Sequence, residues 1–165
     1  MIRTLAIGIL STFILACEKL PDPVVPDTPR EEYNGNDNSG ETDTTMPETI
    51  KITVSGKTLP VKIEDNEATK ALVAALREAS ITYEAHDYGG FEKVGPLGRS
   101  LPASDTQITT QAGDVILYSG NQIVLFYGSN TWSYTRIGKI QSGSQDELED
   151  FLKAGKGNIS VTLSL

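Results

Sequence analysis

The sequence is poor in the residues on which metal sites, disulfides and nucleophilic catalysis depend. It contains one cysteine and one histidine among 165 residues. A single cysteine excludes an intramolecular disulfide, so the fold depends on its hydrophobic core. The histidine, His86, has Asp87 beside it, but neither a set of metal ligands nor a Ser-His-Asp arrangement can be assembled around it. We therefore expect no metal site.

The chain also lacks the motifs and the charge that nucleotides and nucleic acids require. Gly89-Gly90 and Gly95-x-x-Gly98 do not have the strand-to-helix context of a phosphate-binding loop. Acidic residues outnumber basic ones by 22 to 14, which gives a net charge of −8. No basic stripe is available to neutralise phosphates, which argues against a nucleic-acid partner. We expect no cofactor.

The sequence also lacks a long hydrophobic run. A transmembrane helix needs about 20 apolar residues, and no run in this chain is that long. The longest run extends from Leu5 to Leu15 and follows Arg3. A basic residue, a short apolar run and a small residue, here Ala16, are typical in this order of a signal peptide. We expect residues 1–16 to be that peptide.

The end of this segment, Ile14-Leu15-Ala16-Cys17, resembles the bacterial lipobox. The alternative is an ordinary secretory signal with a coincidental cysteine. The resemblance implies that Cys17 becomes the new N-terminus and carries several acyl chains, palmitate among them. Two or more chains anchor a protein stably in a bilayer. We therefore expect a lipoprotein of the cell envelope that reaches its membrane partner through Cys17. The outer membrane or cell surface is favoured over the inner membrane.

Residues 17–48 combine low hydrophobicity with an excess of negative charge. Residues 18–48 hold nine acidic residues against Lys19 and Arg30, a net charge of −7. Such a composition is typical of disorder. About 31 residues of flexible chain span roughly 30 Å. We expect an acidic linker that holds the domain away from the lipid headgroups and contains no site.

Residues 49–165 remain to form one domain, and their apolar residues alternate in the manner of strands. Ser55-Gly56-Lys57 is the expected turn of the first hairpin. Asn66 and Ser144 are expected to cap two short helices. The glycines and prolines of residues 88–102 predict a loop without regular structure. The expected strands are residues 50–54, 59–63, 81–88, 106–110, 115–118, 122–127, 135–140 and 158–165.

Seven or eight strands and two short helices predict an all-β fold, a closed barrel with the helices covering its ends. Three segments of the domain together resemble the bacterial cyclophilin-like proteins: Val94 to Pro102, Gln111 to Gly128 and Asn130 to Ile140. The resemblance covers about residues 50–165. It implies the cyclophilin barrel of eight antiparallel strands with a helix at each end, which agrees with the element order expected above.

The resemblance also bears on activity, because true cyclophilins are peptidyl-prolyl isomerases that use an arginine near a hydrophobic proline pocket. Such an arginine eases rotation about a bond whose barrier is about 20 kcal/mol. By this resemblance Arg99 is the candidate catalytic residue, and Gln122 is a second candidate. The Phe-x-Arg pattern of the true enzymes is absent here, so we expect at most a weak isomerase.

Three residues have competing interpretations. Arg99 is either a site residue or a surface arginine that packs over Phe91 or pairs with Asp105. Trp132, the only tryptophan, either forms a ligand wall or plugs one end of the barrel. Arg136 is expected to be a structural partner for a carboxylate such as Asp114 rather than a ligand-binding group.

Our leading hypothesis is an envelope lipoprotein whose domain binds a peptide or a small ligand in a groove on the side of the barrel, without strong catalysis. Alternation places Gln122, Val124 and Phe126 on one face of their strand, and only one face can line a groove. The alternatives are a peptidyl-prolyl isomerase acting on envelope proteins and a structural component of an envelope complex. The expected groove residues are Phe91, Arg99, Gln122, Phe126 and Trp132.

Overall fold

The computed structural model describes residues 45–165. The expected signal peptide, Cys17 and nearly all of the expected linker lie outside the described residues. Within residues 45–165, no helix is long and apolar enough to cross a membrane.

The first hairpin forms as its alternation predicts. Strands β1 (Thr49–Val54) and β2 (Lys57–Ile63) pair antiparallel, and Val54 lies opposite Lys57. Ser55 and Gly56 alone make the turn, with φ of 49° and 79°. Two successive positive φ values belong to a type I′ turn, whose twist matches that of the strands it joins. The buried residues of β1, which are Ile50, Ile52 and Val54, all belong to the larger hydrophobic cluster.

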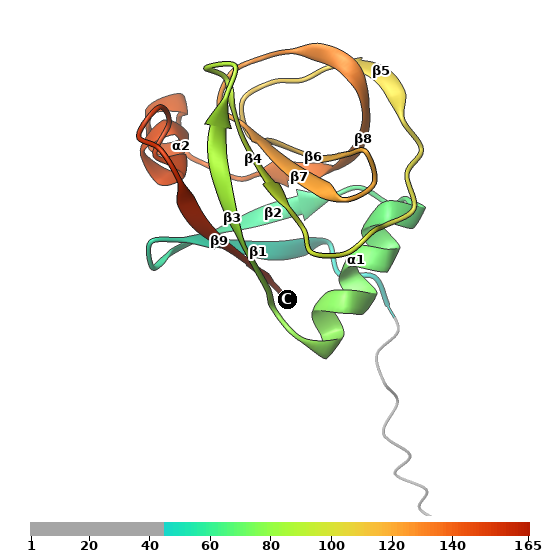
Figure 1. The fold of residues 1–165 in the computed structure, drawn as a ribbon. Coiled ribbons are helices and arrows are strands. Elements are labelled where there is room, and N and C mark those ends of the chain that lie inside the picture. The colour runs from blue at the N-terminus through green and yellow to red at the C-terminus, as the bar shows by residue number, and fades with distance from the viewer. Residues whose placement is uncertain (1–44) are drawn as a thin grey trace, which may run out of the picture. The chain divides into compact units, whose positions relative to one another are not determined.

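Eight antiparallel strands close into a barrel, which confirms the predicted fold (Figure 1). Hydrogen bonds join them in the order β2-β1-β9-β3-β4-β7-β6-β8, and pairing between β8 and β2 closes the ring. The remaining barrel strands are β3 (Ile81–Tyr88), β4 (Glu92–Pro96), β6 (Asp114–Tyr118), β7 (Gln122–Phe126), β8 (Thr131–Ile140) and β9 (Ile159–Ser164).

A two-stranded ribbon stands outside the barrel wall. Strand β5 (Thr106–Thr109) pairs only with residues 131–134 of β8, whereas residues 135–140 of β8 pair with β6 and β2. The expected strand at residues 106–110 is thus real, but it is not one of the eight barrel strands. Strand β8 also begins four residues earlier than its sequence pattern predicts.

Two short helices contribute buried residues to the barrel interior. The helices are α1 (Glu67–Glu78) and α2 (Gln145–Leu152), and Figure 1 shows them on opposite sides of the barrel. The Asn66 and Ser144 side chains accept hydrogen bonds from the backbone N–H groups of Thr69 and Glu147. Both predicted N-caps are therefore confirmed.

The first half of the loop predicted at residues 88–102 is a strand, so that part of the prediction is wrong. Residues Glu92–Pro96 form β4, which lies between β3 and β7 in the barrel wall. Gly95 suits this position because a Cβ atom there would clash with the backbone of Glu84 and the ring of Tyr83. Pro96 is the last residue of the strand and lies beyond the β3–β4 pairing, which ends at Val94.

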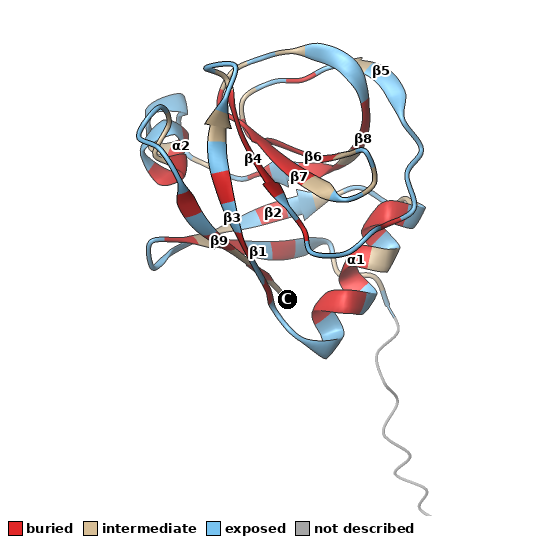
Figure 2. Cartoon of the chain, viewed as in Figure 1, coloured by how far each residue is buried: buried red, intermediate tan, exposed pale blue. Residues whose placement is uncertain are grey.

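The apolar residues form two clusters on the two sides of the barrel wall. The larger cluster includes Ile123 and Leu125 of β7, a strand that Figure 2 colours mostly as buried. The smaller cluster includes Val124 and Phe126 of the same strand, and hence lies on its opposite, outer face. Residues of β7 are therefore buried on both faces, and the outer cluster forms the base of the site described next.

Candidate functional site

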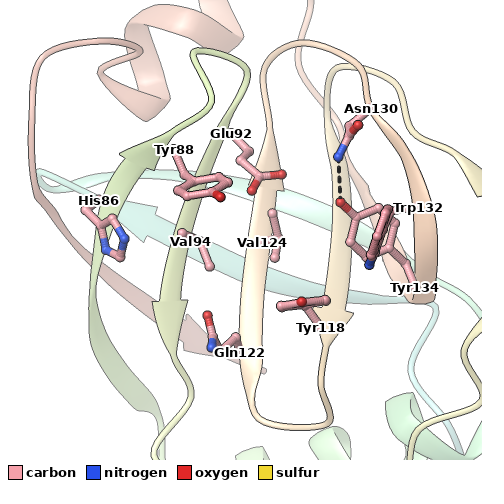
Figure 3. A pocket seen from close by; sticks show the side chains of 10 residues that line it. All are labelled: His86, Tyr88, Glu92, Val94, Tyr118, Gln122, Val124, Asn130, Trp132 and Tyr134. Carbon is pink, nitrogen blue, oxygen red and sulfur yellow. Dashed lines mark hydrogen bonds between the residues drawn. The ribbon is translucent and has the colours of Figure 1, made fainter.

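A groove of about 460 Å³ lies on the outer face of the barrel wall, across β3, β4, β7 and β6 (Figure 3). The ribbon made by β5 and the first half of β8 forms its other side. Its lining is mainly apolar and aromatic. The lining residues are His86, Tyr88, Glu92, Val94, Tyr118, Gln122, Val124, Asn130, Trp132 and Tyr134.

A row of packed aromatic rings supports the groove. The ring of Phe126 stacks on that of Phe91 with 6.2 Å between centroids, and it meets Tyr134 edge to face at 5.8 Å. Tyr134 in turn meets Tyr118 edge to face at 6.0 Å. Such contacts each contribute about 1 kcal/mol beyond the area they bury. The row fixes Tyr118 and Tyr134 as rigid parts of the lining.

A tight turn places Tyr88 and Glu92 opposite each other at one end of the groove. The turn consists of Gly89, Gly90 and Phe91, and both glycines have positive φ, 61° and 77°. Backbone N–H groups of residues 127 and 128 donate to the Phe91 carbonyl at 2.9 and 2.8 Å. The turn is thereby tied to the end of β7, and Tyr88 is left 63 % exposed beside the groove.

Glu92 is the only carboxylate that lines the groove, and it is 6 % exposed. Its Oε2 atom is buried and has no hydrogen-bond partner, and no lysine or arginine of residues 45–165 forms an ion pair with it. Burial raises the pKa of Glu92 from its ordinary value to about 7. The group can therefore hold or release a proton near neutral pH.

The opposite side of the groove is formed by β8 and the residue before it. Asn130 donates from its side-chain amide to the Tyr134 hydroxyl at 3.0 Å. Trp132 lies in β8 opposite Ile108 of β5, and it is 58 % exposed. Trp132 therefore does not plug an end of the barrel, and this interpretation is wrong. Figure 3 shows its ring across the groove from Glu92.

The structure brings some of the expected groove residues together and leaves one outside. Gln122 and Trp132 line the groove. Phe91 and Phe126 belong to the outer cluster that supports it, and Phe126 is fully buried. Arg99 is exposed in the loop after β4 and is not among the lining residues. That loop is held at the β6–β7 turn, where Leu101 N–H donates to the Gly120 carbonyl at 2.7 Å.

Arg99 also makes no ion pair within residues 45–165, so the alternative of a pair with Asp105 is wrong. Asp105 instead accepts a hydrogen bond of 2.6 Å from the Thr135 hydroxyl. Arg136 has the structural role expected of it, because its guanidinium contacts the buried carboxylate of Asp114.

Sequence reasoning missed Glu92, the residue with the most unusual environment in the groove. Glu92 and Lys93 are adjacent charged residues next to two glycines, a composition typical of an exposed loop. Only the pairing of β4 shows that Glu92 shares the outer face with Val94 while Lys93 faces the interior. Tyr88 and His86 were likewise assigned to a strand without a role.

The groove can bind an apolar body and can exchange a proton through Glu92. Among the described residues, no lysine, arginine, serine or cysteine lines it. No group of three or more His, Cys, Asp or Glu side chains within residues 45–165 could hold a metal ion. The donor set therefore suits recognition better than nucleophilic chemistry.

Comparison with known proteins bears on the fold. A family profile described as the cyclophilin-like family matches residues 52–164. A search of curated proteins found no match. The solution structure of the hypothetical protein AF2241 from Archaeoglobus fulgidus is similar, with 20% identity and a TM-score of 0.50 over 76% of this chain and 98% of that one.

A second solved structure, that of McbB in complex with tryptophan, matches with 13% identity and a TM-score of 0.48. The match covers 70% of this chain and 44% of that chain, so this chain spans less than half of McbB. At these levels of identity the likeness to AF2241 extends to the fold alone.

Proposed function

This chain belongs to the cyclophilin-like family, and we propose that its domain binds a peptide or a small ligand in the outer groove, without strong catalysis. We further propose that the protein is lipidated at Cys17 and displays this groove in the cell envelope. Both parts follow from separate features of the chain, and each has its own test.

The exposed aromatic residues are the observation that carries the binding proposal. Within residues 45–165, the large apolar side chains that remain exposed are Tyr88, Trp132 and Leu165. Two of these three lie at the same groove. Exposed apolar side chains gathered on one concave surface, above a rigid base, are typical of a binding site.

The groove favours binding over prolyl isomerisation. An isomerase of the cyclophilin type is expected to place an arginine at the pocket, and Arg99 does not line this one. In a protease-coupled assay with a prolyl tetrapeptide, we expect no more than weak acceleration, and the same rate for Arg99→Ala as for the wild type. A strong activity that Arg99→Ala abolishes would favour the isomerase instead.

Trp132 makes binding measurable, because it is the only tryptophan and lies in the groove. Hexapeptides selected from a random phage-displayed library on the full chain are titrated while tryptophan fluorescence is recorded. We expect saturable changes that Tyr88→Ala weakens about tenfold or more, as for an aromatic anchor. Leu165→Ala, which removes an exposed apolar side chain elsewhere, is the matched control. Equal binding by both variants would contradict the proposal.

The envelope anchor is tested by Cys17→Ala. We expect this variant to leave the membrane fraction and appear in the soluble one, because the acyl chains supply the anchor. Retention of Cys17→Ala in membranes after detergent-free washing would show that another part of the protein holds it there.

A further inference from the structure

One buried carboxylate oxygen at the groove lacks a hydrogen-bond partner. Glu92 Oε2 is buried without a hydrogen-bond partner, although the carboxyl group belongs to a residue that lines an open groove. Figure 3 shows the carboxyl group beside Tyr88, pointing into the space between β4 and the ribbon. Buried polar atoms are nearly always paired in folded proteins, so an unpaired one at a groove indicates a missing partner.

For the ionised carboxylate the missing partner is a hydrogen-bond donor, and a cation satisfies it best. An ionised carboxylate accepts at both oxygens, and burial of its charge without a partner costs several kcal/mol. Among the described residues, the groove supplies no lysine or arginine. Residues 45–165 hold 14 acidic and 11 basic residues, a net charge of −3, which does not oppose the approach of a cation.

The aromatic residues around Glu92 favour a cation for an independent reason. The faces of tyrosine and tryptophan rings carry partial negative charge and attract ammonium groups within about 6 Å. Four such residues line the groove with Glu92: Tyr88, Tyr118, Trp132 and Tyr134. A buried carboxylate that shares an open groove with four aromatic rings matches a positively charged head on an apolar body.

We propose that the groove recognises a ligand with a primary ammonium group on an apolar chain, whose N–H groups donate to the Glu92 carboxylate while the chain lies against Tyr88 and Trp132. This inference rests on the proposed function, because it names the chemical class that the groove accepts. A primary ammonium is favoured over a quaternary one because only the former has N–H groups for the unpaired oxygen.

Three probes with the same apolar body separate the contributions. They are 4-phenylbutylamine, 4-phenylbutanol and the trimethylammonium analogue of the amine. Trp132 fluorescence of the full chain is titrated at pH 8, where Glu92, with a pKa of about 7, is ionised and an alkylamine is still protonated. The other titratable residues lining the groove are His86, Tyr88, Tyr118 and Tyr134, and Tyr127 lies near enough to Glu92 to interact with its charge.

We expect the amine to bind roughly 10- to 100-fold more tightly than the alcohol, as for a hydrogen bond to a charged group. The trimethylammonium probe should fall between the two. Glu92→Gln, which keeps the shape of the side chain, should remove the preference for the amine. Glu84→Gln is the matched control, because Glu84 is an exposed residue of the neighbouring strand β3 that does not line the groove.

Two results would overturn the inference, and neither is confused with failure of the groove itself. Equal binding of the amine and the alcohol by the wild type would show that charge is not recognised, while the groove would still bind. Absence of binding by all three probes, together with fluorescence changes on adding the selected hexapeptides, would leave the groove as a site for ligands without this ammonium group. The probe comparison in the wild type decides the question even if Glu92→Gln folds poorly.

Discussion

Glu92 and Lys93 are neighbours in the chain, but they meet opposite electrostatic environments across the barrel wall. Lys93 is fully buried, and its ammonium group contacts the Asp87 carboxylate at 2.7 Å and the Gly157 carbonyl. Glu92 has no such partner. The charge on the interior face of β4 is therefore paired, whereas the carboxylate on the groove face has no ion-pair partner among the described residues.

Asp87 shows what a satisfied carboxylate looks like in this fold. Burial raises its pKa, but hydrogen bonds from Lys93 and from the N–H groups of Gly157 and Gly155 outweigh that effect. The net result is a pKa below the ordinary value for aspartate. Asp87 therefore stabilises the protein above its unfolded pKa, and this contribution is lost as the pH falls through the lower folded pKa.

Glu92 should have the reverse effect on stability. Its pKa rises from 4.5 to about 7 on folding. Between these pH values the folded protein holds a proton that the unfolded chain has released, so the free energy of unfolding falls as the pH rises. The slope is at most about 1.4 kcal/mol per pH unit. We expect Glu92→Gln to remove this decline, so that the variant gains stability relative to the wild type from pH 4.5 to 7.

Urea unfolding at pH 4.5, 6 and 8 measures the effect, and Glu84→Gln serves again as the exposed control. The control should follow the wild type at every pH. A wild-type curve parallel to that of Glu92→Gln over this range would mean that the Glu92 pKa is not raised, and that the carboxyl group is solvated in the groove.

At the scale of elements, the parts that could be predicted are those with one buried face. The strand β1, the caps at Asn66 and Ser144, and the closing strand β9 each follow a simple alternation or a capping pattern. Strand β4 does not, because four of its five residues are buried, with both faces covered. A strand with two buried faces loses the alternation on which the sequence reading depends.

The groove was only half predicted, because one of its sides depends on pairing between segments that are distant in the sequence. Strand β7 reads as a continuous apolar run, and its parity correctly groups Gln122 with Val124 and Phe126. The sequence contains no sign that β5 and the first half of β8 form a ribbon over that face, because the pairing is between distant segments. Trp132 and Glu92 line the same groove because this ribbon and β4 place them there.

Closure of the barrel depends on the close approach of β8 to β2 at Gly138. A Cβ atom at Gly138 would clash with the Lys62 carbonyl and lie 2.9 Å from the Ile63 Cα atom. These are backbone atoms of a paired strand, so they cannot move aside without disturbing the closure. We expect Gly138→Ala to lower the free energy of unfolding by roughly 1–3 kcal/mol, measured by urea denaturation.

Gly143→Ala is the matched control for that variant. A Cβ atom there would meet only the Glu147 carboxylate oxygen at 3.0 Å, at the end of a flexible side chain. The control should change stability by less than about 1 kcal/mol. Equal stability of Gly138→Ala and the wild type would show that the β2–β8 pairing tolerates a wider spacing than the barrel shows.

At the scale of the whole molecule, the domain begins earlier than the sequence pattern indicates. The expected boundary is at residue 49, but three residues before it already contact the barrel. Arg77 donates to the Thr45 carbonyl at 2.7 Å, and Ile63 N–H donates to the Glu48 carbonyl at 3.0 Å. Met46 packs against the interior cluster. Residues 45–48 therefore belong to the domain rather than to the linker.

Two deletions that differ by four residues test where the linker ends. Removal of residues 18–44 should leave the melting temperature within about a degree, because a segment so acidic and so poor in apolar residues makes few native contacts. Removal of residues 18–48 should lower it by several degrees, since the hydrogen bonds that the Thr45 and Glu48 carbonyls accept and the packing of Met46 are lost with it. Calorimetry on both variants gives the comparison. If the shorter deletion alone lowers the melting temperature as much as the longer one, residues 18–44 pack on the barrel. Ligand binding would then have to be measured on the 18–44 deletion as well, to test whether this segment covers the groove.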